Sequence, residues 1–278
     1  MKPPRTPGCY LPGLDKIRTF WFFLRWGEGI SEESPLVGFP DTIGGIVARQ
    51  ERAVRTRRAI LEAAAAVFDE RGYEAATIAD ILARAGVTKG ALYFHFSSKQ
   101  ELAQGVLDEQ MAEGDVPPRE SKLQELFDVG MVLGYRMRRH PMLSAGARLS
   151  LGPDMREIFG GGSVPAWNDI TEQRLVQAKA QGELLPHVDP AEAAWILSAG
   201  WAGVQLYSQT LTGREDLEQR VASLYRHVYP SIATPAVLAR LDMAADRGER
   251  VVEEIRALEL SLGEEQETAL AVKEPVLT

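Results

Sequence analysis

Cysteine is nearly absent from the 278-residue chain, which contains Cys9 alone. A single thiol forms neither an intramolecular disulfide framework nor a cysteine-based zinc site, so the composition is typical of a protein kept in a reducing compartment. The histidines are few and lack the HxxxH or HExxH spacing of a helical metal site. They are His95, His140, His187 and His227. We therefore expect no metal, no cofactor and a cytoplasmic location.

Long hydrophobic runs are lacking as well. A membrane-spanning helix needs about 20 apolar residues, whereas the aromatic segment Phe20–Trp26 is short and contains Arg25. No small-x-small cleavage site follows this segment, so a secretory signal peptide is a poor match. We expect no membrane partner. We interpret residues 1–46 as an extension that is disordered or lies upstream of a true start at Val47, encoded by GTG.

Positive charge is outweighed by negative charge over the whole chain, whose formal net charge is -8. This balance disfavours an architectural or nonspecific DNA-binding protein, because phosphate contact requires lysine and arginine. The basic side chains nevertheless gather between residues 47 and 60, where Glu51 alone opposes them. These side chains are Arg49, Arg52, Arg55, Arg57 and Arg58. An acidic tail from Glu249 onward offsets them, which predicts a basic edge on an acidic body.

The residues that follow the basic cluster carry helical patterns and helix-capping signals. Apolar residues at three- and four-residue steps predict a long helix that starts near Arg52 and ends at Gly72. Thr77, followed three residues later by Asp80, predicts the N-cap and capping box of a short helix that ends near Ala85.

A second short helix is predicted directly after this one. Gly86 predicts a tight turn, Thr88 predicts the next N-cap, and the helix is expected to run through Phe94. Two short helices around such a turn form a helix-turn-helix. Apolar side chains are expected to hold the unit together: Ala79, Ile81, Leu82, Val87, Leu92 and Phe96.

The second short helix also carries hydroxyl, ammonium and imidazole groups suited to DNA. They belong to Thr88, Lys89, Tyr93 and His95, and Gly90 permits a close approach of the backbone to a phosphate or a base edge. The alternative is that Tyr93 and Phe94 are core aromatics and Lys89 is a solvated charge. The occurrence of all these residues together on one short helix favours a surface that faces DNA.

The segments Thr77-Ile78-Ala79-Asp80-Ile81 and Ala85 to Phe96 resemble the DNA-binding signature of the TetR family. The resemblance implies an all-α fold in which an N-terminal three-helix domain with the helix-turn-helix, residues 47–110, precedes a C-terminal helical ligand-binding and dimerisation domain, residues 111–260. It implies a homodimer on double-stranded operator DNA. The implied operator contacts are Thr77, Thr88, Lys89, Gly90, Tyr93, His95 and Lys99, with phosphate contacts from Arg52 and Arg55.

Beyond Gln110, glycine and proline punctuate a series of predicted helices, and the last helix is expected from about Thr234 to Leu260. Residues 261–278 are expected to be a flexible tail. The stretch Ala193–Leu211 is nearly uncharged and has no polar face, which predicts a helix buried all round. Because the TetR family dimerises through a four-helix bundle, we expect the homodimer interface at this stretch and on the last helix. The alternative is that the stretch forms the core of one protomer.

A small-molecule effector is expected in the C-terminal domain. Trp167 and Gln110 offer an indole N–H and an amide to an otherwise apolar cavity. Five segments are similar to the γ-butyrolactone autoregulator receptors of actinomycetes: Val47–Ala53, Gly90–Phe96, Ala145–Leu149, Gln177–Lys179 and Gly182–His187. The resemblance places Trp167 over the lactone and Gln110 at a polar position beside it. The expected ligand-binding residues are Gln110, Val129, Leu133, Trp167, Trp201 and Gln205.

One departure from these receptors leaves the effector open. Many of them carry a threonine near Gly200 and Trp201, where this chain has no hydroxyl. Loss of one hydrogen bond is worth about 0.5–1.5 kcal/mol, which shifts preference between ligands. The resemblance implies a repressor of antibiotic and secondary-metabolism genes that responds to a γ-butyrolactone, butenolide or furan. The alternative is a pseudo-receptor that responds to an antibiotic or biosynthetic intermediate.

An enzyme is a further alternative. Ser144, Ser150 and Ser163 lack the GxSxG context of a nucleophile, and no pair of acidic residues stands out from the solvated charges. We therefore expect the chain not to be an enzyme.

Overall fold

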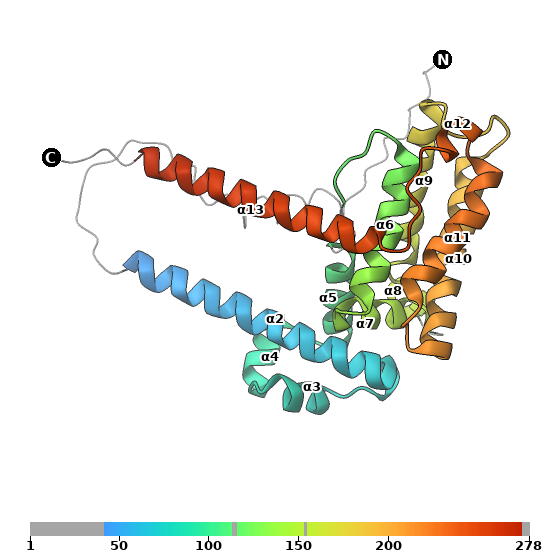
Figure 1. The fold of residues 1–278 in the computed structure, drawn as a ribbon. Coiled ribbons are helices and arrows are strands. Elements are labelled where there is room, and N and C mark those ends of the chain that lie inside the picture. The colour runs from blue at the N-terminus through green and yellow to red at the C-terminus, as the bar shows by residue number, and fades with distance from the viewer. Residues whose placement is uncertain (1–41, 113–115, 153–154, 274–278) are drawn as a thin grey trace, which may run out of the picture. The chain divides into compact units, whose positions relative to one another are not determined.

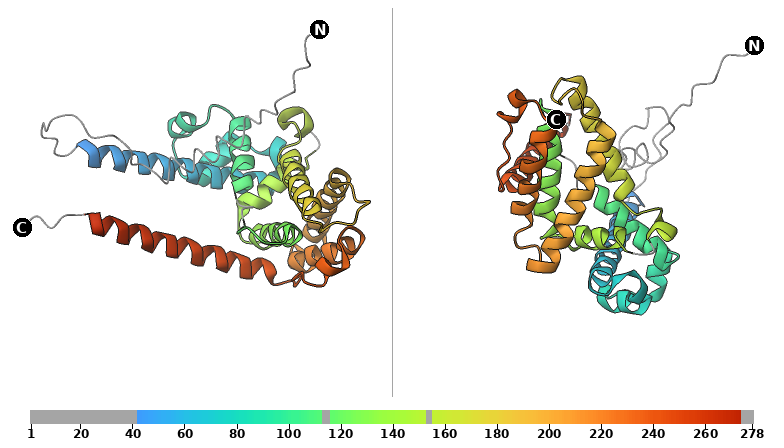
Figure 2. Two further views of the ribbon diagram at one scale, coloured as in Figure 1. Left: turned by 90° about the horizontal axis from the view of Figure 1, so that it is seen from above. Right: turned by 90° about the vertical axis from the view of Figure 1, so that its right-hand side faces the viewer.

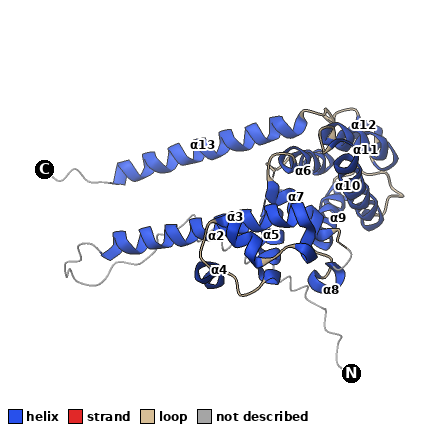
Figure 3. Ribbon diagram, turned by 90° about the horizontal axis from the view of Figure 1, so that it is seen from below, coloured by secondary structure: helices blue, strands red, loops and turns tan. Residues whose placement is uncertain are grey.

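The computed structural model describes residues 42–112, 116–152 and 155–273. Within these ranges the chain is helix and loop, apart from one isolated β-bridge between Leu184 and Ala233 (Figure 3). The boundary between the two compact units of the chain falls inside the first described helix, between Arg49 and Gln50. Most of the expected N-terminal extension, up to residue 41, lies outside the described residues. The first described helix begins at Thr42, so the last residues of that extension are helical.

The helix-turn-helix unit consists of α2 (Thr42–Ala75), α3 (Ile78–Ala85), α4 (Lys89–His95) and α5 (Lys99–Ala112) (Figure 1). The regular part of α2 ends as predicted at Gly72, whose φ of 77° and ψ of 169° are non-helical. From residue 60 onward these helices share one apolar core. Its fully buried side chains include Ile60, Leu61, Phe68, Ile81, Leu92 and Leu102.

The C-terminal body contains α6 (Lys122–Met137), α7 (Pro141–Ser150), α8 (Met155–Phe159), α9 (Val164–Ala180), α10 (Pro190–Thr212), α11 (Leu217–Ile232), α12 (Pro235–Leu238) and α13 (Arg247–Lys273). Four of them form a ring, in which α6 and α10 each pack against both α9 and α11 (Figure 2). Phe127, Leu143 and Tyr229 are fully buried in this second core.

Buried carboxylates fix the ends of the body helices. Glu183 accepts hydrogen bonds from the backbone N–H groups of Lys122 and Leu123, at 2.8 and 2.9 Å, which satisfies the free donors at the start of α6. Asp128, which is fully buried, accepts 2.8 Å hydrogen bonds from both Arg119 and Arg247. This paired charge attaches the start of α13 to α6.

The prediction of one helix from Thr234 to Leu260 is wrong, because residues 239–246 interrupt it. The Gln124 side chain accepts a hydrogen bond from the Asp242 backbone N–H at 2.8 Å and donates to the Asp242 carbonyl at 3.1 Å. These long-range bonds occupy the backbone N–H and carbonyl of Asp242, which in a continuous helix would bond within the helix. The structure continues α13 through residues 261–273, a segment rich in glutamate and alanine, which favour helix. The flexibility of this tail stays a prediction.

One face of α10 is not covered within the protomer. Trp195 is 68% exposed, Tyr207 71% and Leu211 75%. The alternative that this stretch forms the core of one protomer is therefore wrong for this face. The residues on its other side, including Ala194 and Leu197, are buried.

Candidate operator-binding unit and ligand cavity

The first helix of the helix-turn-helix is fixed by the predicted capping box. The Asp80 backbone N–H donates to the Thr77 hydroxyl oxygen at 3.1 Å, and the Thr77 N–H donates to the Asp80 carboxylate at 3.3 Å. The hydrogen bond from the Thr77 hydroxyl, together with the charge of Arg71 at 2.8 Å, holds the pKa of Asp80 below its usual range. Gly86, with φ of 64° and ψ of 25°, makes the left-handed turn into α4, a conformation that glycine adopts without steric cost.

The second helix, α4, is held by its apolar side and exposes the rest. The Ala91 N–H donates to the Thr88 hydroxyl oxygen at 3.2 Å, as the predicted cap requires, and Leu92 is fully buried. Tyr93 is 44% exposed and Phe94 80% exposed, so the alternative that both are core aromatics is wrong.

The remaining predicted side chains on this surface are also accessible. Thr77, Thr88, Lys89 and Gly90 are exposed. Ala79 is exposed too, so its predicted role in holding the unit together is wrong. It lies on the outer side of the short amphipathic helix α3, whose buried residue is Ile81.

The basic side chains of α2 divide into two groups. Arg52 and Arg55 are exposed. Arg57 instead lies over the Phe96 ring at 5.2 Å and pairs with Glu109 at 3.7 Å. Partial burial, with the nearby charge of Arg57, lowers the pKa of His95, which favours the neutral imidazole.

Lys99 has a structural position that the sequence pattern did not suggest. Its ammonium donates to the carbonyl oxygens of Tyr73, Ala76 and Glu74 at 2.9, 3.2 and 3.3 Å. The same group lies 4.4 Å from the centre of the Tyr73 ring. Because a cation stabilises free carbonyl groups at a helix C-terminus, Lys99 joins the end of α2 to the start of α5.

A cavity of about 660 Å³ lies within the C-terminal body. Its walls come from α5, α6, α7, α9, α10 and α11. Most of the lining side chains are apolar. All six residues predicted to bind a ligand line this one cavity: Gln110, Val129, Leu133, Trp167, Trp201 and Gln205. Tyr225 of α11 also lines it. The sequence analysis missed this residue, because a tyrosine on the apolar side of a helix is typical of a core position.

Gln110 is held at one end of the cavity by two serines. The Ser163 hydroxyl donates to Gln110 Oε1 at 2.9 Å, and the hydroxyls of Ser150 and Ser163 are 2.8 Å apart. Gln110 belongs to α5, the last helix of the helix-turn-helix unit (α2 to α5), which is also called the operator-binding unit below. The cavity wall is therefore partly made of that unit.

Gln205 begins a second polar connection from the cavity to the operator-binding unit. Arg214 donates to Gln205 Oε1 at 3.1 Å and also to the Ser144 hydroxyl oxygen. The Ser144 hydroxyl donates in turn to the Asp69 carboxylate of α2 at 2.8 Å. Burial lowers the pKa of Arg214, and the charge of Asp69 opposes this shift. We call this hydrogen-bonded series of side chains the Arg214 chain; it consists of Asp69, Ser144, Arg214 and Gln205.

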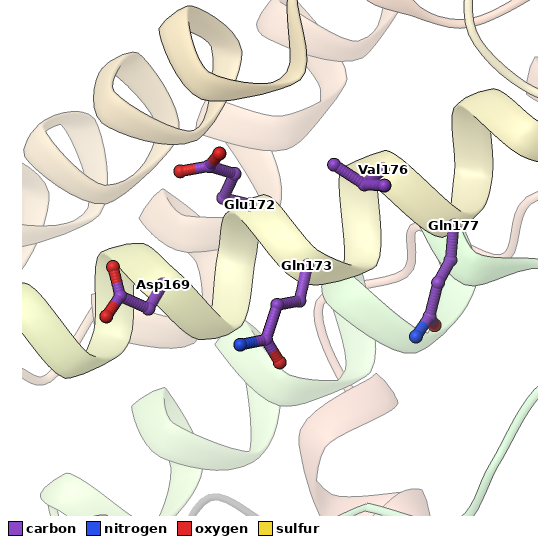
Figure 4. Close-up of a pocket in the computed structure, with 5 residues that line it drawn as sticks. All are labelled: Asp169, Glu172, Gln173, Val176 and Gln177. Atoms are coloured by element: carbon purple, nitrogen blue, oxygen red, sulfur yellow. The ribbon is translucent and has the colours of Figure 1, made fainter. Parts of the chain in front are cut away.

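A second hollow lies on the outer surface of α9 (Figure 4). Its lining residues are Asp169, Glu172, Gln173, Val176 and Gln177. All of them project from one helix, so the hollow lacks the convergence of groups from several elements that the larger cavity has. We assign it no ligand.

The described ranges contain neither a cluster of metal-binding side chains nor a helix suited to a membrane. Within residues 42–112, 116–152 and 155–273, no three His, Cys, Asp or Glu side chains group in a way that would hold a metal ion. No helix in the same ranges combines the length and the hydropathy needed to cross a membrane.

The fold and these two sites define a class of protein: a helix-turn-helix DNA-binding regulator with a ligand cavity in a separate helical body. Residues 60–106 match the family model of bacterial regulatory proteins, tetR family. The chain is 44% identical over 216 residues to the A-factor receptor protein of Streptomyces griseus, which covers 75% of this chain and 77% of that protein. This chain therefore belongs to the tetR family of bacterial regulatory proteins.

Solved structures agree with this assignment. TylP, a TetR regulator from Streptomyces fradiae, is 44% identical and superposes with a TM-score of 0.67 over 73% of this chain and 98% of TylP. CprB of Streptomyces coelicolor, solved with its operator sequence, is 29% identical, with a TM-score of 0.55 over 74% of this chain and 97% of CprB.

Proposed function

We propose that this protein is a transcriptional repressor that binds operator DNA as a homodimer and is released by a γ-butyrolactone. The observation that carries the proposal is a cavity whose two glutamine side chains are linked to the operator-binding unit. Gln110 is part of that unit, and Gln205 is connected to it through the Arg214 chain. The A-factor receptor protein, 44% identical, supports the effector class, as does the crystal structure of a γ-butyrolactone receptor, which is 30% identical with a TM-score of 0.58. The proposed targets are genes of antibiotic and secondary metabolism.

Operator recognition is assigned to α4 in the major groove. Lys89, Tyr93 and His95 approach bases and phosphates, and Gly90 lets the backbone come close to the DNA. Thr77 and Thr88, which cap the two helices, contact phosphates beside them. Arg52 and Arg55 add phosphate contacts from α2, whereas Lys99 acts by holding the ends of α2 and α5 together.

The dimer interface is assigned to the uncovered face of α10. Trp195, Ile196, Leu206, Tyr207 and Leu211 are large apolar side chains that are 48–75% exposed in the protomer. A second copy of this face would remove them from water, and such burial is the main favourable contribution to association. Operator DNA in a bacterial cell places the working dimer in the cytoplasm.

Release is proposed to follow a population shift. A ligand in the cavity favours one arrangement of Gln110 and Gln205. Gln110 is part of α5, and Gln205 is connected to α2 through the Arg214 chain. The recognition helices of the dimer then no longer match successive major grooves, about 34 Å apart.

An enzymatic function is not proposed. The serines that a hydrolase would use as a nucleophile have structural hydrogen bonds here. Ser144 bonds to Asp69, and Ser163 bonds to Gln110 and Ser150.

The test is a gel-shift assay on a duplex from the gene's own upstream region. The operator complex is expected to form, to dissociate with a γ-butyrolactone, and to persist in the Trp167→Ala variant at the same lactone concentration. An operator complex that responds to an antibiotic intermediate but not to lactones would instead favour the pseudo-receptor alternative. Absence of sequence-specific binding would contradict the repressor itself.

A further inference from the structure

The two glutamine amides in the cavity wall, those of Gln110 and Gln205, present hydrogen-bond donors to a ligand. The amide oxygens of Gln110 and Gln205 already accept hydrogen bonds, from Ser163 and Arg214 respectively. Each amide therefore keeps its N–H groups for a ligand. These bonds also fix the orientation of both amides.

Tyr225 adds a further donor from α11. The residue is 4% exposed and lines the cavity, yet its hydroxyl has no hydrogen bond to the described part of the chain. Among the described side chains, the buried polar atoms that are inaccessible to solvent and lack a hydrogen bond are Asn168 Oδ1, Arg174 Nε and Arg214 Nε, of which Arg174 Nε forms an ion pair with Glu125. The Tyr225 hydroxyl is not one of these inaccessible atoms, so it opens onto the cavity.

The surroundings of Tyr225 hold its hydroxyl in place. The ring makes edge contacts with Phe127 and Tyr229, at centroid distances of 5.2 and 5.1 Å. Gly130 provides the space: a Cβ there would overlap the hydroxyl and come within 2.8 Å of Tyr225 Cε2. Burial raises the pKa of Tyr225 far above its ordinary value, so the hydroxyl stays protonated and can donate.

Charge on the cavity wall limits the ligand further. Among the described residues that line the cavity, Asp169 is the only charged side chain. Arg214 lies behind Gln205 and is not part of the lining. A ligand carboxylate would therefore be buried without a cationic partner, which is strongly unfavourable.

We propose that Tyr225 is a specificity-determining residue, whose hydroxyl donates a hydrogen bond to an oxygen of an uncharged ligand that offers acceptors, such as an intact lactone ring. This inference rests on the proposed function and narrows its effector. Tyr225 supplies from α11 a hydroxyl that Gly200 and Trp201 do not provide.

The test uses three probes that differ in one feature each. γ-Decalactone has the ring and the carbonyl, 2-hexyloxolane has the same ring without the carbonyl, and 4-hydroxydecanoate is the ring-opened acid. Binding to the full-length protein is followed by quenching of tryptophan fluorescence, because Trp167 and Trp201 line the cavity. The wild type is expected to prefer the lactone about tenfold over the ether, and to bind the acid at least 100-fold more weakly than the lactone.

Tyr225→Phe removes only the hydroxyl. We expect lactone affinity to fall about fivefold to tenfold while ether affinity is unchanged, so the preference for the lactone is lost. The matched control is Tyr229→Phe. The Tyr229 hydroxyl donates to the Leu123 carbonyl in the core, at 3.0 Å, and is not part of the cavity lining. This control is expected to lower the melting temperature and to keep the preference for the lactone.

Four outcomes would overturn the inference: an equal loss of lactone and ether affinity in Tyr225→Phe, no loss in that variant, strong binding of the acid, or no binding of the lactone by the wild type. Operator binding is measured in parallel on the same samples. If the operator complex forms while any of these outcomes is found, the inference fails and the repressor remains. If the operator complex does not form, the proposed function fails.

Discussion

Replacing Arg214 with glycine removes the side chain that joins the cavity to α2. The position suits glycine, because Arg214 has a φ of 70° and is the one non-glycine residue with positive φ in the described part of the chain. That conformation costs a non-glycine residue about 1–2 kcal/mol. The backbone turn is therefore expected to survive the substitution, which separates loss of the side chain from loss of the fold.

The change in stability is expected to be small. The variant loses two hydrogen bonds from a charged donor, to Ser144 and Gln205, each worth about 1.5–3 kcal/mol. Glycine adopts the positive φ of this position without the steric cost that arginine has, which offsets about 1–2 kcal/mol of the lost hydrogen-bond energy. Removal of a buried guanidinium, whose burial costs several kcal/mol, offsets most of the remainder. We expect a net change of no more than about 2 kcal/mol, measured by urea unfolding.

The response to ligand is expected to change much more. Coupling between two sites is typically about 1–3 kcal/mol, or about 5–150-fold in affinity. The assay is fluorescence anisotropy of an operator duplex, titrated with and without a saturating γ-butyrolactone. Arg214→Gly is expected to keep operator affinity and to reduce the ligand-induced loss of affinity to less than about threefold.

Arg220→Ala is the matched control, since Arg220 is an exposed arginine nearby that pairs with Asp216 at 2.7 Å. It is expected to leave the ligand response intact. An Arg214→Gly variant that binds operator and ligand normally and still releases operator to the full extent would contradict coupling through the Arg214 chain.

Three shorter predictions concern the operator and the dimer. Lys89→Ala is expected to weaken operator binding by about 1–3 kcal/mol in anisotropy titrations, without changing the ligand affinity measured by tryptophan quenching. The pKa of His95 is lowered in the free protein by burial and by Arg57, whereas a phosphate contact would raise it. Proton uptake on binding should then increase operator affinity as the pH falls from 7 to 5.5, and His95→Gln should abolish this dependence. Leu211→Arg is expected to place like charges on both copies of the uncovered α10 face, and to shift sedimentation from dimer toward monomer.

Local signals allowed most of the helix-turn-helix to be predicted from the sequence. The capping box of Thr77 and Asp80, the turn at Gly86 and the cap at Thr88 all depend on residues within four positions of each other. Such local contacts form within the helix and its flanking residues and do not depend on how the helix packs in the folded protein. The structure therefore confirms them.

Features that depend on distant partners were not predicted. The break before α13 is made by Gln124, which lies 118 positions from Asp242 in the sequence. The bonds of the Lys99 ammonium to the carbonyl groups of Tyr73, Glu74 and Ala76 were not predicted, because no local pattern reveals partners more than 20 positions away. The contact of Lys99 with DNA, which the resemblance implied, stays a prediction. Tyr225 was missed for the same reason, since the space beside Gly130 becomes visible only after α6 and α11 have packed together.

The position of α7 explains how a cavity in the body can influence a helix that reads DNA. Ala145 and Leu149 of α7 belong to the apolar core of the operator-binding unit, whereas Leu143 and Ala147 of the same helix belong to the core of the body. Ser144 lies on this shared helix and bonds to both Asp69 and Arg214. Under the proposed release mechanism, a ligand that displaces Gln205 would act through Arg214 and Ser144 on a helix that has buried contacts in both cores, and we expect the movement to reach α2.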